Sequence, residues 1–278
     1  MNEEQGKFWG GIGGDARVEL QEQMDGQLLP LGEAVMDAVA VQPGEHVLDV
    51  GCGCGATSIA LAEFAGTHGS VVGCDISEPM LARAALRAKQ SSLSNTSFVE
   101  ADAQTAPLGG PFHVIFSRFG VMFFEDPLAA FENLRRATRA GGRLGFVCWQ
   151  SPLLNEAFSF LGPIGNEILG PGEPIPPTAP GPFAFADPDY VRVIIAAAGW
   201  SNVEVTECRR QMQVFGTTDV EHALEAAMRI GPFSRRLIGM PPEVARRART
   251  AVAAALESRW TPNGWISDGV CWLVTARN

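Results

Sequence analysis

The stretch VLDVGCGCGATSIALAE, residues 47–63, constrains the fold of this chain more than any other segment. A run of aliphatic residues leads into alternating glycines and cysteines, and a helical pattern follows directly. A strand, a glycine loop and a helix in this order are typical of α/β proteins that bring the loop backbone close to a ligand. The loop could serve a metal, a dinucleotide or another adenosine-containing cofactor, and the rest of the chain has to distinguish these sites.

Short apolar runs recur through residues 43–150, most of them separated by helical patterns. Because they are apolar throughout, they are typical of strands buried on both faces in a parallel sheet covered by helices. The sequence therefore predicts a doubly wound, mostly parallel α/β sheet, with a ligand crevice at the carboxyl ends of its strands. The five strands are expected at 46–50, 70–75, 96–102, 112–117 and 143–149.

The flanking segments have a different character. Residues 1–42 are expected to form a helical N-terminal lid, with a loop and a helix before a second helix at 31–41. A segment rich in proline and glycine, GPGEPIPPTAPGPF, follows the fifth strand. We expect residues 151–278 to supply helical cap insertions and the last strands, with an antiparallel C-terminal strand at the edge of the sheet.

A metal site is not favoured by the cysteine pattern. Cys52 and Cys54 are separated by one residue, and no partner pair of cysteines or histidines stands at a zinc-like spacing. The four histidines are scattered along the chain. We expect no metal, and we interpret both cysteines as small side chains in a tight turn.

A dinucleotide loop fits the glycines but fits the acidic residues less well. GCGCGA at 51–56 matches the fingerprint, and Asp75 follows at about the separation of a ribose-binding acid. However, Asp49 at the end of the first strand would face a pyrophosphate poorly, whereas it would suit a cationic ligand. Asp102 adds a second acid after the third strand. An NAD(P)-dependent oxidoreductase therefore remains an alternative.

Together these segments resemble the class I S-adenosylmethionine-dependent methyltransferases. VLDVGCGCG is similar to the first motif of that family, VVGCDIS to its ribose-binding acid, EADAQ to its adenine-flanking acid and FHVIFSRFGVMFF to its fourth-strand motif. LRRATRAGGRLGFVCW is similar to its helix, glycine turn and fifth strand. The resemblance covers residues 45–150. Within the family, the chain is most similar to the branch of ubiquinone/menaquinone C-methyltransferases and related small-molecule enzymes.

The resemblance implies S-adenosylmethionine as cofactor and S-adenosylhomocysteine as product. Asp49 would favour the cationic amino end, Asp75 would accept both ribose hydroxyls, and Asp102 would accept from the adenine amino group. Each acid could instead be a capping, turn or loop residue. The implied cofactor-binding residues are Asp49, Gly51, Cys52, Gly53, Asp75, Ile76, Met80, Asp102, Ala103, Ser117 and Arg118.

The substrate side has weaker signals. Methyl transfer is an in-line displacement that depends on alignment, so a general base is needed only where the acceptor must lose a proton. Trp9 of the expected lid and Phe123 after the fourth strand are candidates for the substrate wall, with Met228 and Phe233 of the expected cap. His222 is a weak candidate for a base. Ordinary packing, or exposure in the case of His222, is the alternative for each.

The charge and hydropathy of the chain limit the kinds of molecule that it is expected to bind. The formal net charge of −10 and pI near 4.9 argue against nucleic acid, since phosphate contacts need a basic surface. No apolar run reaches the length of a membrane span, and the polar N-terminus does not resemble a secretory signal. We expect a cytoplasmic protein with a small-molecule substrate, and a homodimer as an open alternative to a monomer.

The function expected from the sequence is S-adenosylmethionine-dependent methyl transfer to a small, partly apolar molecule. A noncatalytic S-adenosylmethionine-binding protein, or another transferase on the same scaffold such as an aminopropyltransferase, remains an alternative because fold does not fix function.

Overall fold

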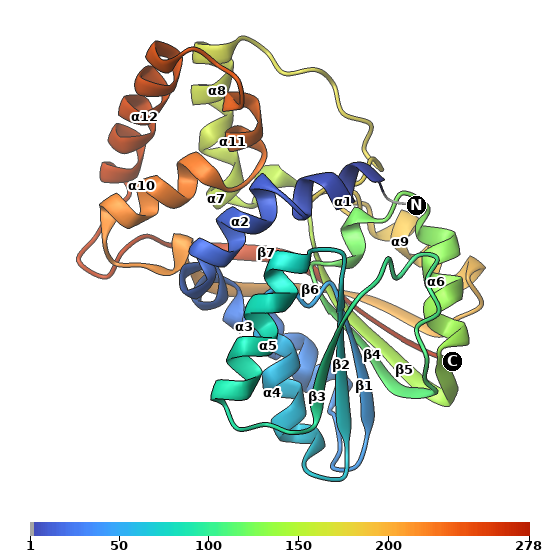
Figure 1. Cartoon of the computed structure of the whole chain (residues 1–278). Coiled ribbons are helices and arrows are strands. Elements are labelled where there is room, and N and C mark those ends of the chain that lie inside the picture. The colour runs from blue at the N-terminus through green and yellow to red at the C-terminus, as the bar shows by residue number, and fades with distance from the viewer. Residues whose placement is uncertain (1–2) are drawn as a thin grey trace.

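The computed structural model describes residues 3–278 and contains one seven-stranded sheet (Figure 1). The strands follow the order β3-β2-β1-β4-β5-β7-β6, with parallel pairing from β3 to β5 and antiparallel pairing of β7 with β5 and β6. Their bounds are β1 His46–Val50, β2 Ser70–Asp75, β3 Thr96–Glu100, β4 Phe112–Arg118, β5 Thr138–Trp149, β6 Ser201–Gln213 and β7 Ile266–Arg277.

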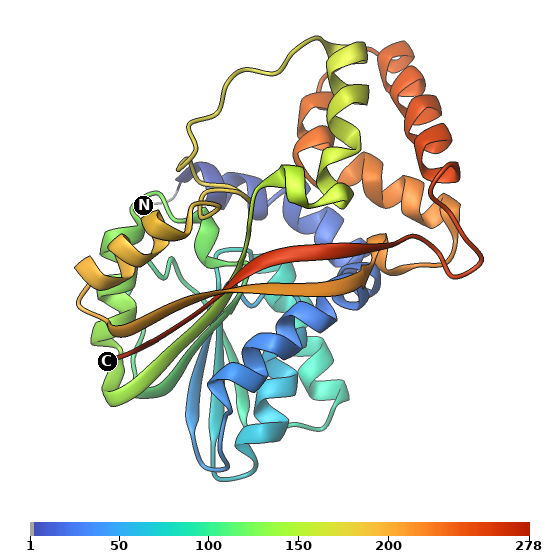
Figure 2. The same cartoon turned by 180° about the vertical axis from the view of Figure 1, so that it is seen from behind.

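This sheet confirms the predicted doubly wound, mostly parallel architecture with an antiparallel C-terminal strand. The prediction that the C-terminal strand lies at the edge of the sheet is wrong. The edge strand is β6, and the C-terminal strand β7 lies between β5 and β6. The long strands β6 and β7 cross the front of the view in Figure 2, which shows the molecule from behind. The chain therefore returns once more into the sheet, so that β7 is paired on both sides.

Helices cover both faces of the sheet. The helices α3, α4 and α5 pack on one face, and α6 and α9 on the other (Figure 1). The bounds are α1 Glu3–Trp9, α2 Ile12–Glu19, α3 Gln21–Val39, α4 Ala56–Ala65, α5 Glu78–Gln90, α6 Pro127–Arg136, α7 Glu156–Ser159, α8 Leu161–Leu169, α9 Pro188–Ala197, α10 Val220–Arg229, α11 Pro232–Leu237 and α12 Pro242–Glu257, with short 3-10 turns η1 Val121–Phe123, η2 Pro152–Leu154 and η3 Val214–Gly216.

Two predicted helix boundaries are wrong. The N-terminal region was expected to break before a helix at 31–41, but α3 runs from Gln21 to Val39 with Pro30 inside it. Packing along the sheet overrides the proline, since α3 buries Leu31 and Val35 completely. The helix α6 ends at Arg136 instead of at the paired glycines, which lie within an irregular stretch of β5.

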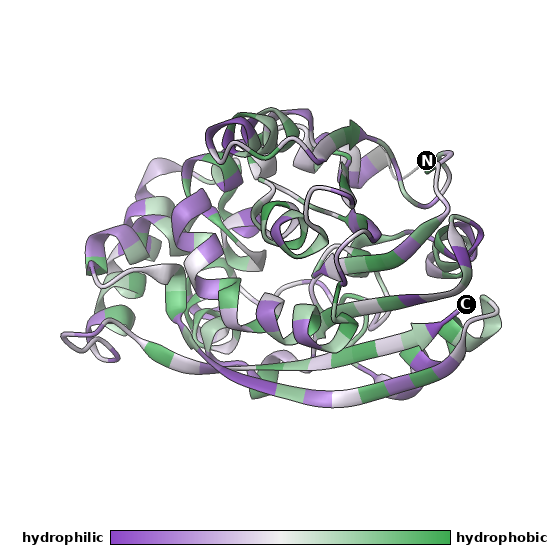
Figure 3. Ribbon diagram, turned by 90° about the horizontal axis from the view of Figure 1, so that it is seen from below, coloured by the Kyte–Doolittle hydropathy of each residue, from purple (hydrophilic) through white to green (hydrophobic). Residues whose placement is uncertain are grey.

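The hydrophobic core has two parts. The main core lies between the sheet and the helices beside it. A second core joins α8, α10, α11 and α12, which we call the outer helical cluster, and it buries Phe160, Phe233, Val252 and Trp265. Figure 3 shows hydrophobic residues recurring along the strands, whereas the surrounding helices carry both hydrophobic and hydrophilic residues. This mixed pattern is expected of helices with one buried face.

The N-terminal helices lie over one end of the sheet. In Figure 1, α1 and α2 cross above the upper ends of the central strands, and the outer helical cluster stands next to them. Within residues 3–278, no helix combines the length and apolar character that a bilayer span requires.

Candidate functional site

The glycine loop after β1 is held close to the ends of the neighbouring strands. The backbone N–H groups of Gly51 and Cys52 donate to the Cys74 carbonyl at 2.8 and 3.1 Å. Gly51 has φ +68°, and a Cβ there would lie 2.6 Å from the Gly120 Cα. This position therefore requires glycine both for its backbone conformation and for the close approach of the loop that follows β4.

Asp49 is fully buried at the end of β1, and only one of its two carboxylate oxygens has a partner. Its Oδ2 accepts hydrogen bonds from the Thr57 and Ser58 hydroxyls at 2.7 and 2.6 Å. Its Oδ1 is buried without a hydrogen-bond donor among the described residues. Burial raises the pKa of Asp49, while the two hydroxyls and the charge of Arg118 act in the opposite direction.

An unpartnered buried carboxylate oxygen is unfavourable unless a ligand supplies the donor. The predicted cofactor carries an ammonium group, which would supply such a donor. The Oδ1 atom of Asp49 therefore fits the group that the sequence assigned to it.

Asp75 lies at the end of β2 and is 8% exposed. Its Oδ2 accepts from the Gly53 N–H at 2.8 Å, and its Oδ1 accepts from the Ser77 N–H at 3.0 Å. Burial raises the pKa of Asp75 to about 6, although the backbone donors oppose the shift. Because each carboxylate oxygen has a second lone pair, the ionised side chain can still accept from two ribose hydroxyls.

The third acidic position follows β3. The N–H of Ala101 donates to the Asp75 carbonyl at 2.9 Å, which sets the chain before Asp102 beside the end of β2. Asp102 Oδ1 accepts from the Gln104 N–H at 3.0 Å, and Ala103 is buried with its carbonyl accepting from the Asn133 side chain. The end of β3 is therefore fixed next to the end of β2.

The remaining predicted cofactor residues lie around the same loop. Cys52 is 3% exposed and Met80 is 7% exposed. The Met80 sulfur lies 3.8 Å from the position that a Cβ on Gly53 would occupy. Ile76 follows Asp75 directly and is half-buried.

At the end of β4, the two predicted residues have different environments. The Ser117 hydroxyl donates to the Val50 carbonyl at 2.7 Å and accepts from the Gly120 N–H at 3.1 Å, which ties β4 to β1. The Arg118 guanidinium forms an ion pair with Asp25 of α3 at 3.3 Å. Ser117 is thus satisfied by the backbone, whereas Arg118 links the strand end to α3.

Trp9 lies against the strand ends. Its ring packs edge-on against Phe123 with 5.3 Å between centroids, and its carbonyl accepts from the Ser77 hydroxyl at 2.6 Å. Ser77 is at the N-cap position of α5, as predicted, but its hydroxyl bonds to Trp9 and makes no capping bond. The structure therefore brings Trp9 and Phe123 together across 114 positions of the chain.

The other substrate candidates lie farther out. Phe233 is buried in the core of the outer helical cluster, and the half-buried Met228 packs against that core. His222 is on α10 with its side chain 64% exposed, and its described ionic contact is with Asp219 at 3.6 Å. The structure does not gather these three residues with the glycine loop and the three acids.

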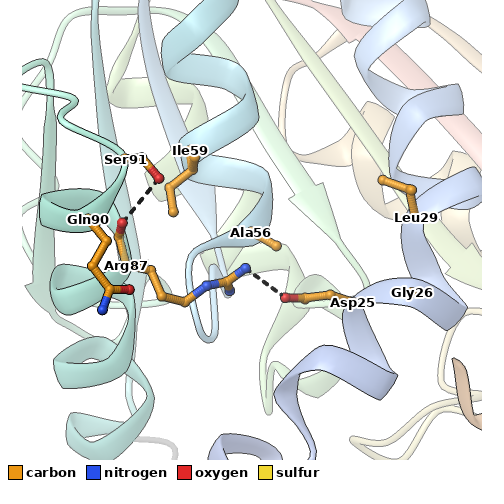
Figure 4. Close-up of a pocket in the computed structure, with 8 residues that line it drawn as sticks. All are labelled: Asp25, Gly26, Leu29, Ala56, Ile59, Arg87, Gln90 and Ser91. Atoms are coloured by element: carbon orange, nitrogen blue, oxygen red, sulfur yellow. Dashed lines mark hydrogen bonds and ion pairs between the residues drawn. The ribbon is translucent and has the colours of Figure 1, made fainter. Parts of the chain in front are cut away.

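A pocket of about 430 Å³ opens beside this site, between α3, α4 and α5 (Figure 4). None of the three acidic residues predicted to hold the cofactor lines it. The strand ends are the better candidate for the cofactor site, because the unpartnered Oδ1 atom of Asp49 lies there. The lining residues are Asp25, Gly26, Leu29, Ala56, Ile59, Arg87, Gln90 and Ser91.

Sequence reasoning missed several side chains at the site. Thr57 and Ser58 follow the glycine loop in the first turn of α4, and two hydroxyls in that position are a signal that could have been noticed. Arg87 donates to the Cys54 carbonyl at 2.6 Å and pairs with Asp25 at 3.0 Å. No local pattern connects Asp25 with Arg87, because the pair depends on how α3 packs beside α5.

Comparison with known proteins identifies the class. A family model described as "Methyltransferase domain" matches residues 47–142. Nocamycin O-methyltransferase of Saccharothrix syringae is 31% identical over 195 residues, which are 66% of this chain and 69% of that protein. Demethylmenaquinone methyltransferase of Staphylococcus carnosus is 30% identical over 182 residues, 62% of this chain and 74% of that protein. The chain belongs to the S-adenosylmethionine-dependent methyltransferase family, which confirms the predicted resemblance.

Other matches are partial or concern the fold alone. Three mycobacterial relatives, described only as uncharacterized proteins, are 35% identical over 137 residues, and the chain spans about half of their length, 47%. The solved structure of an S-adenosylmethionine-dependent methyltransferase from Aquifex aeolicus aligns with this chain at a TM-score of 0.50 and 19% identity. The alignment covers 88% of this chain and 88% of that protein. At that identity the similarity supports the Rossmann-like fold and no particular substrate.

Proposed function

We propose that this chain binds S-adenosylmethionine at the carboxyl ends of β1, β2 and β3 and transfers its methyl group to a small, partly apolar molecule. The observation that carries the proposal is the buried Oδ1 of Asp49, which has no donor among the described residues. Membership of the methyltransferase family supports the same reading.

Each acidic residue then has a separate task. Asp49 Oδ1 would accept from the amino group of the cofactor while Thr57 and Ser58 hold its Oδ2. Asp75 would accept from the ribose hydroxyls, and the backbone after β3 would meet the adenine. When bound, the cofactor supplies a methyl group on a positively charged sulfur. The acids orient the cofactor, and alignment with the acceptor accounts for much of the acceleration.

The acceptor side is supported by the aromatic contact between Trp9 and Phe123. Trp9 would act as part of a lid that covers the reacting atoms and excludes water. The nocamycin and demethylmenaquinone enzymes are named for methyl transfer to small molecules. We infer that this chain also acts on a small molecule, with an apolar part that packs against the two rings.

Binding of S-adenosylhomocysteine to Asp49→Asn tests the assignment. The asparagine can keep its oxygen on the two hydroxyls, but its NH₂ group would then face the ligand ammonium. We expect affinity to fall about tenfold to 100-fold, in line with the loss of one hydrogen bond to a charged group. Asp37→Asn, an exposed substitution on α3, is the matched control and should bind like the wild type.

Unchanged affinity in Asp49→Asn would contradict the site. Transfer of labelled methyl groups to a panel of phenols, naphthols and quinols, each with and without a carboxylate, then tests catalysis. Tight cofactor binding with no transfer to any member would favour the noncatalytic alternative.

A further inference from the structure

Two arginines from distant parts of the chain lie next to Trp9. The Arg17 guanidinium of α2 is 5.8 Å from the centre of the Trp9 ring, and the Arg235 guanidinium of α11 is 6.0 Å from it. Arg235 also stacks on Phe8 at 3.7 Å. The two positive charges therefore border the aromatic wall at the proposed acceptor site, one from the N-terminal helices and one from the outer helical cluster.

Asp25, whose charge acts on Arg17, is already bound to other groups. Asp25 forms ion pairs with Arg87 at 3.0 Å and with Arg118 at 3.3 Å, and it accepts from the Gln21 side chain at 2.6 Å. Figure 4 shows the contact of Asp25 with Arg87. Within residues 3–278, the guanidinium of Arg17 forms neither an ion pair nor a hydrogen bond, and the same holds for Arg235.

Arg17 is half-buried beside Trp9, whereas Arg235 on α11 is exposed, so the unfavourable position is that of Arg17. Burial, followed by the charge of Arg118, lowers the pKa of Arg17 to about 10. Cations removed from water are normally paired with an anion. The chain as a whole is acidic, with a formal net charge of −10. The two neighbouring arginines are therefore a local feature that the overall charge does not explain.

We propose that Arg17 and Arg235 bind a carboxylate, or a similar planar anion, carried by the methyl acceptor. The inference rests on the proposed function and names the chemical class of its substrate. A guanidinium offers parallel donors that match the two oxygens of a carboxylate, which makes arginine suited to this task. The apolar part of the acceptor would lie against Trp9 and Phe123.

Two features favour the acceptor over the cofactor as the source of the anion. Arg235 comes from the outer helical cluster, outside residues 47–142 that match the family model, where family members are free to differ in the molecule they accept. The cofactor also brings a sulfonium charge. An anionic acceptor would compensate both that charge and the arginines, since opposite charges attract strongly in a partly dry site.

A matched pair of probes tests the inference. 2-Naphthoate and 2-naphthamide have nearly the same shape and differ in charge, and each would be titrated into the protein saturated with S-adenosylhomocysteine. We expect the wild type to bind the carboxylate at least about tenfold more tightly than the amide. Arg17→Gln and Arg235→Gln should each remove most of this preference, and Arg17→Lys should keep part of it.

The controls separate recognition from folding. Arg229 lies on α10 and forms an ion pair with Glu19 of α2. Arg229→Gln should leave the preference for the carboxylate probe unchanged. Thermal unfolding gives a second readout, because removing the half-buried Arg17 cation, which has no anionic partner, should not lower the melting temperature. A melting temperature that falls in Arg17→Gln, together with an unchanged carboxylate preference, would assign Arg17 a structural role and overturn the inference.

Two other results would also overturn it. One is a wild type that binds the naphthoate no better than the amide. The other is an Arg17→Gln variant that binds S-adenosylhomocysteine more weakly but 5′-methylthioadenosine normally, since Arg17 would then serve the cofactor carboxylate. Failure of the wild type to bind S-adenosylhomocysteine would contradict the proposed function, whereas the two probes titrated alone would still test the arginine pair.

Discussion

Asp75 offers a quantitative prediction because its carboxyl group is buried before any ligand is considered. Burial raises its pKa from the ordinary 3.8 to about 6. The folded state therefore holds the proton at pH values where the unfolded chain has lost it. The contribution of the Asp75 carboxyl to the unfolding free energy is fully present below the pKa of the unfolded chain, 3.8. It is lost as the pH rises through the pKa of the folded state, about 6.

The size of the effect follows from the difference between the two pKa values. One pKa unit corresponds to about 1.4 kcal/mol, so the full stabilisation is about 3 kcal/mol. Between about pH 4.5 and about pH 7.5, the same linkage removes about 2 kcal/mol from the wild type. Asp75→Asn cannot titrate, and its unfolding free energy lacks this component.

Urea unfolding of wild type and Asp75→Asn at these two pH values measures the difference. Relative to the variant, the wild type should lose about 2 kcal/mol of unfolding free energy as the pH rises. Any constant effect of the substitution on the Gly53 and Ser77 hydrogen bonds cancels in this comparison. A difference that stays constant, or that changes in favour of the wild type at neutral pH, would refute the reasoning.

Three further predictions concern other parts of the site. Gly51→Ala should lower the unfolding free energy by about 2 kcal/mol or more, because the new Cβ meets backbone at 2.6 Å, whereas Gly44→Ala adds a Cβ in open space at a similar φ and should cost less. Trp9→Ala should lower kcat/KM of methyl transfer about fivefold by removing an aromatic contact worth about 1 kcal/mol, and Trp9→Phe should keep most of the activity. His222→Ala should change kcat by less than about twofold, since the side chain is 64% exposed; a drop of about 100-fold would restore it as a general base.

The parallel sheet and the positions of its first five strands along the chain could be predicted because their signals are local. Each strand is a short apolar run, and the glycine loop follows the first of them directly. The three acids follow neighbouring strands, so parallel pairing alone brings their ends to one edge. The strand limits were less accurate, as β5 begins at Thr138, five residues before the expected start.

The contacts between distant segments could not be predicted. The continuity of α3 depends on its packing against the sheet, which outweighs the local effect of Pro30. The positions of Arg17 and Arg235 around Trp9 depend on how α2 and α11 meet, and neither helix carries a motif for that meeting. Hydrophobic periodicity in the sequence indicates which face of a helix is buried, but it does not indicate which other element packs against that face.

The central claim is that the glycine loop and its acids hold S-adenosylmethionine. Isothermal titration of the purified wild-type protein with S-adenosylmethionine, S-adenosylhomocysteine and NADH in parallel tests it most directly. The account predicts micromolar binding of both adenosyl ligands and no binding of NADH. Binding of NADH alone would contradict it, and would mean that the loop serves a dinucleotide despite the unpartnered Asp49 oxygen.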